Sequence, residues 1–230
     1  MSKSTFAEWH KNVYKYRYDG HIHVGILVGG IPTDPKVAEG WLKAKLVPAN
    51  DEETITQKVA ETMAERGITA DEAVKEVAAL KTLNGFKRDG SGLYIEGRQL
   101  KACIKEAANI RWPKARWGIS AKGTKSFWAE HVFVAEDRLY LGVDEPTNVQ
   151  QRFVSTWRGT GIQNEEYVEN AEFDFTVLTD FDFSTVKADV SSDVFADLWV
   201  TAEQNGLGAS RSQGYGKFSV ISWGEAVNGG

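Results

Sequence analysis

The chain of 230 residues is poor in cysteine. Its only one is Cys103, so the chain cannot form an internal disulfide bond. This usage fits a reducing compartment such as the cytoplasm. Cys103 shares a helical face with Leu100, Ile104 and Ala107, a pattern that predicts a buried, unreactive thiol.

Long apolar runs are also missing. No stretch approaches the ~18 apolar residues that a membrane-spanning helix needs, and the polar N-terminus has no signal-peptide core. The chain is 42% hydrophobic and 26% charged, like ordinary globular proteins. We therefore expect a cytoplasmic protein with no membrane partner, folded as a single domain over residues 1–230.

Signatures of catalysis and metal binding are scarce. The sequence contains no nucleophile elbow, zinc-ligand spacing or EF-hand loop. His21 and His23 share one face of a predicted strand, but no acid or cysteine follows at a recognisable ligand spacing, which favours a structural role. Asp34 precedes Pro35, which is typical of a turn or helix cap. We therefore expect no catalytic residue, no metal and no cofactor.

The formal net charge of −5 does not suggest a nucleic-acid-binding protein, but the cations are unevenly distributed. Between residues 98 and 125 a single acid, Glu106, is outnumbered by cations. Aromatic residues such as Trp117 lie among them, and single-stranded nucleic acids are bound by this combination of cations and flat rings. The alternative is a solvated helix face with tryptophans in the core. We call residues 98–125 the basic segment; its cations are Arg98, Lys101, Lys105, Arg111, Lys114, Arg116, Lys122 and Lys125.

A glycine-rich loop at residues 206–217 lies between a predicted helix, 193–204, and a predicted strand, 218–223. The order helix, loop, strand excludes a Walker loop and a dinucleotide fingerprint, which run strand, loop, helix. Glycines allow backbone N–H groups to approach a ligand closely, whereas the alternative is a helix cap at Gly206 followed by a turn. The candidate ligand-binding residues here are Gly206, Gly208, Ser210, Arg211, Gly214, Tyr215 and Lys217.

This loop resembles the C-terminal signature of the RAMP superfamily, the ferredoxin-like proteins of CRISPR effector complexes. The pattern is G-x-G, a basic residue, then G-[YF]-G-x-[FV]. A second stretch, Phe86 to Lys101, resembles the turn, strand and "IPGSSLKG" helix start of that family, although Glu96 and Ala102 replace its proline and second glycine. The loop residues that match are Gly206, Gly208, Arg211, Gly214, Tyr215, Gly216 and Phe218.

The resemblance implies an α+β, ferredoxin-like (RRM-like) antiparallel sheet with helices on one face. A helical insertion at about 50–84 and a region at about 111–170 would project from it. It also implies a non-catalytic backbone subunit that binds single-stranded guide RNA independently of sequence, with other effector subunits and further copies of itself, head to tail, as partners. Alternatives are a guide-processing ribonuclease using His10, His21, His23 or His131, and a RAMP-like protein of a mobile element.

Periodicity predicts the remaining elements. Helices are expected over 98–109 and over 69–83, the latter with a capping box between Thr69 and Glu72. Strands are expected over 93–95 and 172–178. Residues 13–18 and 21–28 are expected to form two strands joined by a turn at Asp19-Gly20. A further hairpin is expected between 127–134 and 138–141.

Overall fold

The computed structural model describes residues 14–30, 60–72 except 62, 68 and 71, 83–117, 122–156, 159–183, 190 and 193–226. The chain divides into two compact units. Unit 1 comprises residues 1–27, 94–143 and 169–230, and unit 2 comprises residues 28–93 and 144–168. Two long strands, β1 (Tyr16–Val28) and β10 (Gly159–Thr179), contribute residues to both units.

The sheet of unit 1 has the strand order of a ferredoxin-like fold. β1 lies between β11 (Phe218–Glu225) and β10, and β10 also pairs with β7 (Val132–Val134), which gives the order β11-β1-β10-β7. The β1–β11 and β7–β10 pairs are antiparallel. Helix α5 (Gly97–Arg111) lies between β1 and β7 in the chain, and α7 (Val194–Asn205) lies between β10 and β11. The expected α+β fold class is thus confirmed.

β1 is one continuous strand of 13 residues, so the expected turn at Asp19-Gly20 is wrong. Gly20 serves close packing instead, because a Cβ atom there would lie 2.4 Å from the ring of Phe175. Ile22 and Val24 are fully buried on one face of the strand. The alternate face carries polar residues such as His21, as expected for an antiparallel sheet covered on one side.

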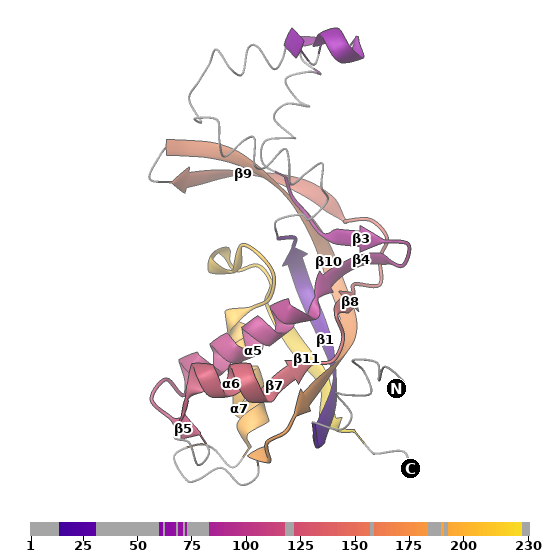
Figure 1. Ribbon diagram of the computed structural model, residues 1–230. Coiled ribbons are helices and arrows are strands. Elements are labelled where there is room, and N and C mark those ends of the chain that lie inside the picture. The colour runs from indigo at the N-terminus through magenta and orange to yellow at the C-terminus, as the bar shows by residue number, and fades with distance from the viewer. Residues whose placement is uncertain are drawn as a thin grey trace, which may run out of the picture. The chain divides into compact units, whose positions relative to one another are not determined.

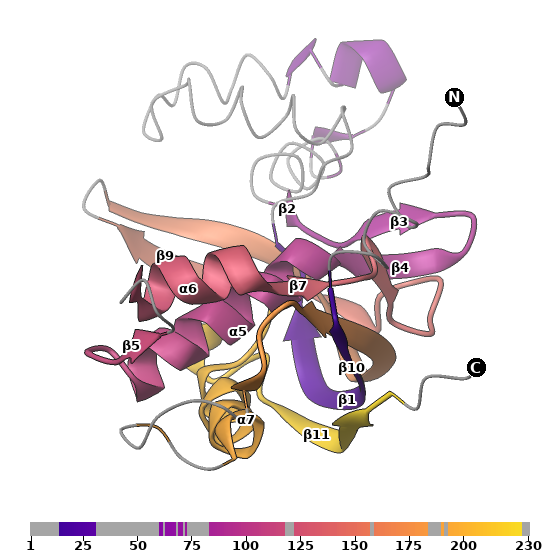
Figure 2. The ribbon, with the colours of Figure 1, turned by 60° about the horizontal axis from the view of Figure 1, so that its bottom comes forward.

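Helices α5 and α7 pack on each other and lie on one side of β1 and β11 (Figures 1 and 2). The expected inward face of α5 is confirmed: Leu100, Cys103, Ile104 and Ala107 are buried. Asp193 caps α7 by accepting a hydrogen bond from the backbone N–H of Ala196 (3.0 Å), which satisfies one of the free donors at the helix start.

Residues 127–134, expected to be a strand, form mostly helix: α6 (Thr124–His131) precedes the short β7. The reason is an aromatic cluster that only the tertiary structure assembles. Phe127 and Trp128 are adjacent and both buried, against Trp117 and Phe183. A strand would have turned one of the two outward. The hydroxyl of Thr124 accepts a hydrogen bond from the indole of Trp117 (3.0 Å) and donates one to the carbonyl of Trp112 (2.5 Å).

The hairpin expected between 127–134 and 138–141 is also wrong. β8 (Arg138–Tyr140) pairs antiparallel with β4 (Gly92–Glu96), whereas β7 pairs with β10. The strand expected at 93–95 is confirmed as part of β4, and the strand expected at 172–178 is confirmed as part of β10. The β5 (Arg116–Trp117) and β6 (Lys122–Gly123) strands form a small hairpin of their own.

Unit 2 contains an antiparallel pair of β9 (Asn148–Thr156) with the first part of β10, to which β2 (Leu83–Asn84) adds in parallel. β3 (Lys87–Asp89) follows. Gly30 and Gly85 lie next to each other beside these strands, since the N–H of Gly85 donates to the carbonyl of Gly30 (2.8 Å). The two ends of the segment between Gly30 and Gly85 are therefore adjacent.

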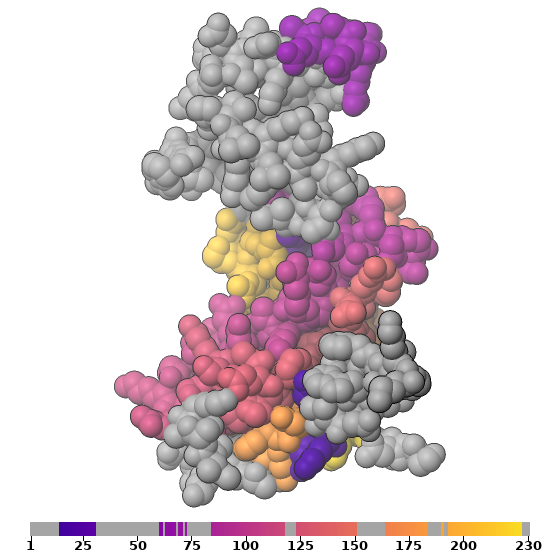
Figure 3. Space-filling view, in the orientation of Figure 1, coloured from indigo at the N-terminus to yellow at the C-terminus, as the bar shows by residue number. Residues whose placement is uncertain are grey.

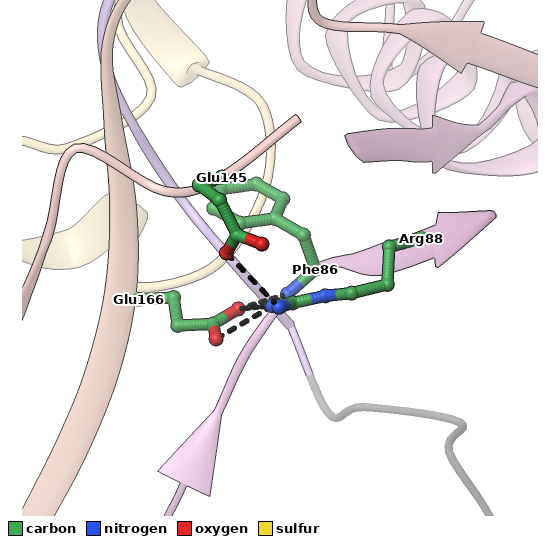
Figure 4. Close-up of polar contacts among 4 residues, drawn as sticks. All are labelled: Phe86, Arg88, Glu145 and Glu166. Atoms are coloured by element: carbon green, nitrogen blue, oxygen red, sulfur yellow. Dashed lines mark hydrogen bonds and ion pairs between the residues drawn. The ribbon is translucent and has the colours of Figure 1, made fainter. Parts of the chain in front are cut away.

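The buried carboxylate of Glu166 binds the chain just after Gly85 (Figure 4). Glu166 accepts hydrogen bonds from the backbone N–H of Phe86 (2.9 Å) and from the guanidinium of Arg88 (2.7 and 2.8 Å), which also faces Glu145 at 3.5 Å. Gly85 is required here, because a Cβ atom would lie 2.5 Å from a carboxylate oxygen of Glu166.

Most of the expected insertion at 50–84, and the residues from 31 to 59 including Asp34, lie outside the described residues. The capping box is confirmed: the N–H of Thr69 donates to Glu72 (2.9 Å), and the N–H of Glu72 donates to the Thr69 hydroxyl (3.4 Å). Within the described part of the chain, no helix is both long and apolar enough to cross a bilayer.

Candidate nucleic-acid interface

The glycine-rich loop begins where α7 ends. Gly206 caps the helix with φ of 84°, and its N–H donates to the carbonyl of Ala202 (2.8 Å). Gly208, Gly214 and Gly216 also have positive φ (79°, 92° and 73°), and so does Ser210 (57°). The cap that was one expectation for Gly206 is confirmed, and the other glycines adopt a backbone conformation that side chains disfavour.

Unit 1 holds this loop firmly. The N–H of Leu207 donates to the carbonyl of Gly216 (2.8 Å), and the N–H of Gly216 donates to the carbonyl of Ile26 in β1 (2.8 Å). The thiol of Cys103 in α5 contacts the carbonyl of Gly206 (Sγ–O 3.4 Å), and burial raises its pKa to about 12. The expected buried, unreactive thiol therefore also ties the loop to α5.

Two backbone donors of the loop remain available. Among the described residues, neither Gly208 nor Ala209 has an acceptor for its N–H group. They precede Ser210, and left-handed residues interspersed in such a turn direct successive N–H groups toward one side. The loop is at the surface of unit 1 (yellow in Figure 3). This geometry suits the approach of an anion.

The two cations of the loop both have partners. Arg211 donates from Nη1 to Glu106 in α5 (2.7 Å), and Lys217 donates to the carbonyl of Gln204. The hydrogen bond from Arg211 holds the pKa of Glu106 below its usual value; burial opposes this effect, and the charges of Arg211 and Lys125 add to it. Glu106 thereby links the loop to the basic segment, a contact that sequence analysis missed because the two residues are 105 positions apart.

Three cations of the basic segment are bound within unit 1. Arg98 pairs with Glu96 (2.5 Å), and Arg111 pairs with Asp197 of α7 (2.9 Å). The ammonium of Lys101 donates to the carbonyl of Ala129 (2.9 Å) and lies 3.6 Å from the ring centre of Phe133. Burial, followed by the nearby charge of Lys105, lowers the pKa of Lys101. These three cations therefore already have partners within unit 1.

The remaining described cations are available. The side chains of Lys105, Lys114, Arg116 and Lys125 have no hydrogen bond or ion pair with any described residue. Lys114, Arg116 and Lys125 are exposed, and Lys105 is half-buried. Of Lys122 only the backbone, in β6, is described.

Trp117, the aromatic candidate of the basic segment, is buried in the structure. It is 0% exposed, and its ring is enclosed by Trp112, Phe127 and Trp128. Trp112 and Trp128 are buried as well. Their burial supports the alternative, that these tryptophans belong to the core. The order of cations and rings along the sequence does not reveal which rings face inward.

The histidines of β1 occupy a polar surface. His21 contacts Asp174 of β10 through Nδ1 (2.8 Å) and faces Glu172 through Nε2 (3.6 Å). His131 pairs with Asp180 (2.8 Å). Among the described residues, no three His, Cys, Asp or Glu side chains are arranged to hold a metal ion.

Comparisons with known proteins give little direct guidance. No protein-family model matches the chain, and no curated protein matches it. Solved structures include one described as "Cryo-EM structure of the Type III-B Cmr-beta bound to cognate target RNA", with 11% sequence identity and a TM-score of 0.48. The match covers 95% of this chain and 63% of that chain, so this chain spans less than two thirds of that neighbour's length.

Proposed function

We propose that this protein binds single-stranded RNA through the glycine-rich loop and the unpaired cations of the basic segment. The observation that carries the proposal is the contrast within the basic segment. Arg98 and Arg111 form ion pairs within unit 1, whereas Lys114, Arg116 and Lys125 are exposed and have no described partner. Exposed cations without counter-ions raise the local potential and attract a polyanion.

The ligand class follows from the chemistry of these groups. Ammonium, guanidinium and backbone N–H groups all bind phosphate oxygens, and such contacts position a strand without reading its bases. Trp117 is buried and supplies no stacking surface. Binding is therefore largely independent of sequence, as a subunit that must accept any guide requires.

The resemblance of the loop and of residues 86–101 to RAMP proteins suggests the setting. In that setting the protein is a repeating, non-catalytic backbone subunit of a CRISPR-type ribonucleoprotein, associating head to tail with its own copies and with other effector subunits. The solved structure reported above is described as bound to target RNA, which makes RNA the first ligand to test.

Fluorescence anisotropy with ~30-nucleotide RNAs of unrelated sequence tests the proposal. With about four cations engaged, the slope of log affinity against log salt is expected to be roughly −3. Arg116→Ala should weaken binding of all sequences about equally, whereas Lys15→Ala, an exposed cation outside the basic segment, serves as the matched control. A flat salt response, or equal losses for both variants, would exclude binding through the basic segment.

A further inference from the structure

The contact between Glu106 and Arg211 places an acid at the position where the proposed interface needs positive charge. Glu106 is the only acid of the basic segment, and Arg211 is the only arginine of the glycine-rich loop. Their side chains meet at 2.7 Å, although both are partly exposed, at 46% and 34%. Glu106 therefore does more than add a charge to the exposed face of α5: it pairs with a cation of the glycine-rich loop.

The pair is built so that it can be broken. One guanidinium nitrogen of Arg211, Nη1, contacts one carboxylate oxygen of Glu106. Exposed ion pairs of this kind contribute little to stability, so exchanging the carboxylate for another anion costs little.

We propose that a backbone phosphate replaces Glu106 as the partner of Arg211 when RNA binds. In the free protein Glu106 pairs with Arg211, and in the complex the phosphate does. This inference rests on the proposed function and deepens it, because it names the group that sets the affinity of the loop. An incoming phosphate competes with Glu106 for Arg211. Short or isolated anions are therefore disfavoured, whereas a strand that also contacts Lys114, Arg116 and Lys125 displaces the carboxylate.

The test removes the charge of Glu106 and keeps its shape. Glu106→Gln should bind single-stranded RNA about fivefold more tightly at low salt, the effect of removing one like charge ~4 Å from a phosphate in water. The salt slope should stay close to that of the wild type, since Arg211 neutralises one phosphate in both proteins. In the Glu106→Gln background, Arg211→Gln should abolish this gain.

Asp137→Asn is the matched control. Asp137 is exposed in unit 1 and lies beside Gly97, at the other end of α5, where its carbonyl accepts the Gly97 N–H. Glu106 is nine positions along α5 from Gly97, a rise of about 13 Å, which exceeds the Debye length of about 10 Å in 0.1 M salt. The control should therefore change the affinity much less than Glu106→Gln does.

Two outcomes would overturn the inference. Weaker RNA binding by Glu106→Gln would show that Glu106 positions Arg211 for the ligand, and an unchanged affinity would show that Arg211 does not meet phosphate. Tripolyphosphate, titrated while the Arg211 Nε–H signal is followed by NMR, separates this question from the proposed function. A shift of that signal that is larger in Glu106→Gln supports the exchange even if the wild-type protein does not bind RNA, and no shift in either protein rejects it.

Discussion

Gly214 and Gly216 offer a direct comparison within one loop, because both have positive φ but differ in their surroundings. A Cβ atom on Gly216 would lie 1.8 Å from the carbonyl oxygen of Leu207, whereas ordinary contacts begin at 3.4 Å. A Cβ atom on Gly214 would meet nothing within 4 Å. Substitution by alanine therefore separates backbone strain from a steric clash.

Gly216→Ala should be strongly destabilising. The left-handed conformation costs about 1–2 kcal/mol for a residue with a side chain. The displacement of Leu207 would also disrupt the Leu207–Gly216 and Gly216–Ile26 hydrogen bonds, each contributing about 1 kcal/mol. The reduced entropy of the unfolded chain offsets some of this loss. We expect a net loss of about 3 kcal/mol, which lowers Tm by roughly 6–12 °C in a protein of this size.

Gly214→Ala should cost only about 1 kcal/mol, or roughly 2–4 °C in Tm. Its effect on RNA should be larger, since the added methyl group lies at the exposed side of the loop, where the proposed strand approaches. Thermal unfolding and RNA anisotropy on both variants check the reasoning. Equal losses of Tm would refute the steric argument at Gly216, and unchanged RNA affinity in Gly214→Ala would place the ligand elsewhere.

Four further outcomes are expected. Because Arg211 lowers the pKa of Glu106 in the folded state, their pair contributes stability above the unfolded pKa and loses it as pH falls through the folded pKa. The Tm difference between wild type and Glu106→Gln should therefore shrink between about pH 6 and pH 3 in calorimetry, and a growing difference would contradict this sign. Thr124→Val should cost about 1–3 kcal/mol in chemical unfolding, because it removes the acceptor of a buried indole N–H and the donor to a buried carbonyl; an unchanged midpoint would argue against that hydrogen-bond network. Deleting residues 51–82 should weaken assembly on long RNA more than binding to a single site, as measured by sizing, and one protein per long RNA at saturation would exclude head-to-tail assembly. Asp34→Ala should leave RNA binding intact, and metal-dependent cleavage of labelled RNA by the wild type alone would make Asp34 catalytic.

Local sequence determined the elements whose apolar spacing and caps agree. The inward face of α5 was predictable from Leu100 to Ala107, and the start and end of α7 were predictable from Asp193 and Gly206. Such elements need only their own periodicity and the hydrogen-bonding preferences of their end residues. The glycines of the loop were likewise recognisable, because positive φ demands glycine wherever the loop lies.

Tertiary structure decided the features that depend on distant partners. Gly20 looks like a turn residue, but it continues β1 because the ring of Phe175 fills the space of its missing side chain. Phe127 and Trp128 fit a strand by composition, yet both are buried when residues 124–131 are helical.

The interface shows the same division between sequence and structure. Sequence alone revealed an excess of cations at 98–125, because charge is a property of composition. It could not reveal which cations are paired, since the acids that bind them come from elsewhere in the fold: Asp197 for Arg111, and Glu106 for Arg211. Ion pairing acts over a few ångströms in space whatever the separation along the chain, and only the folded chain brings these partners together.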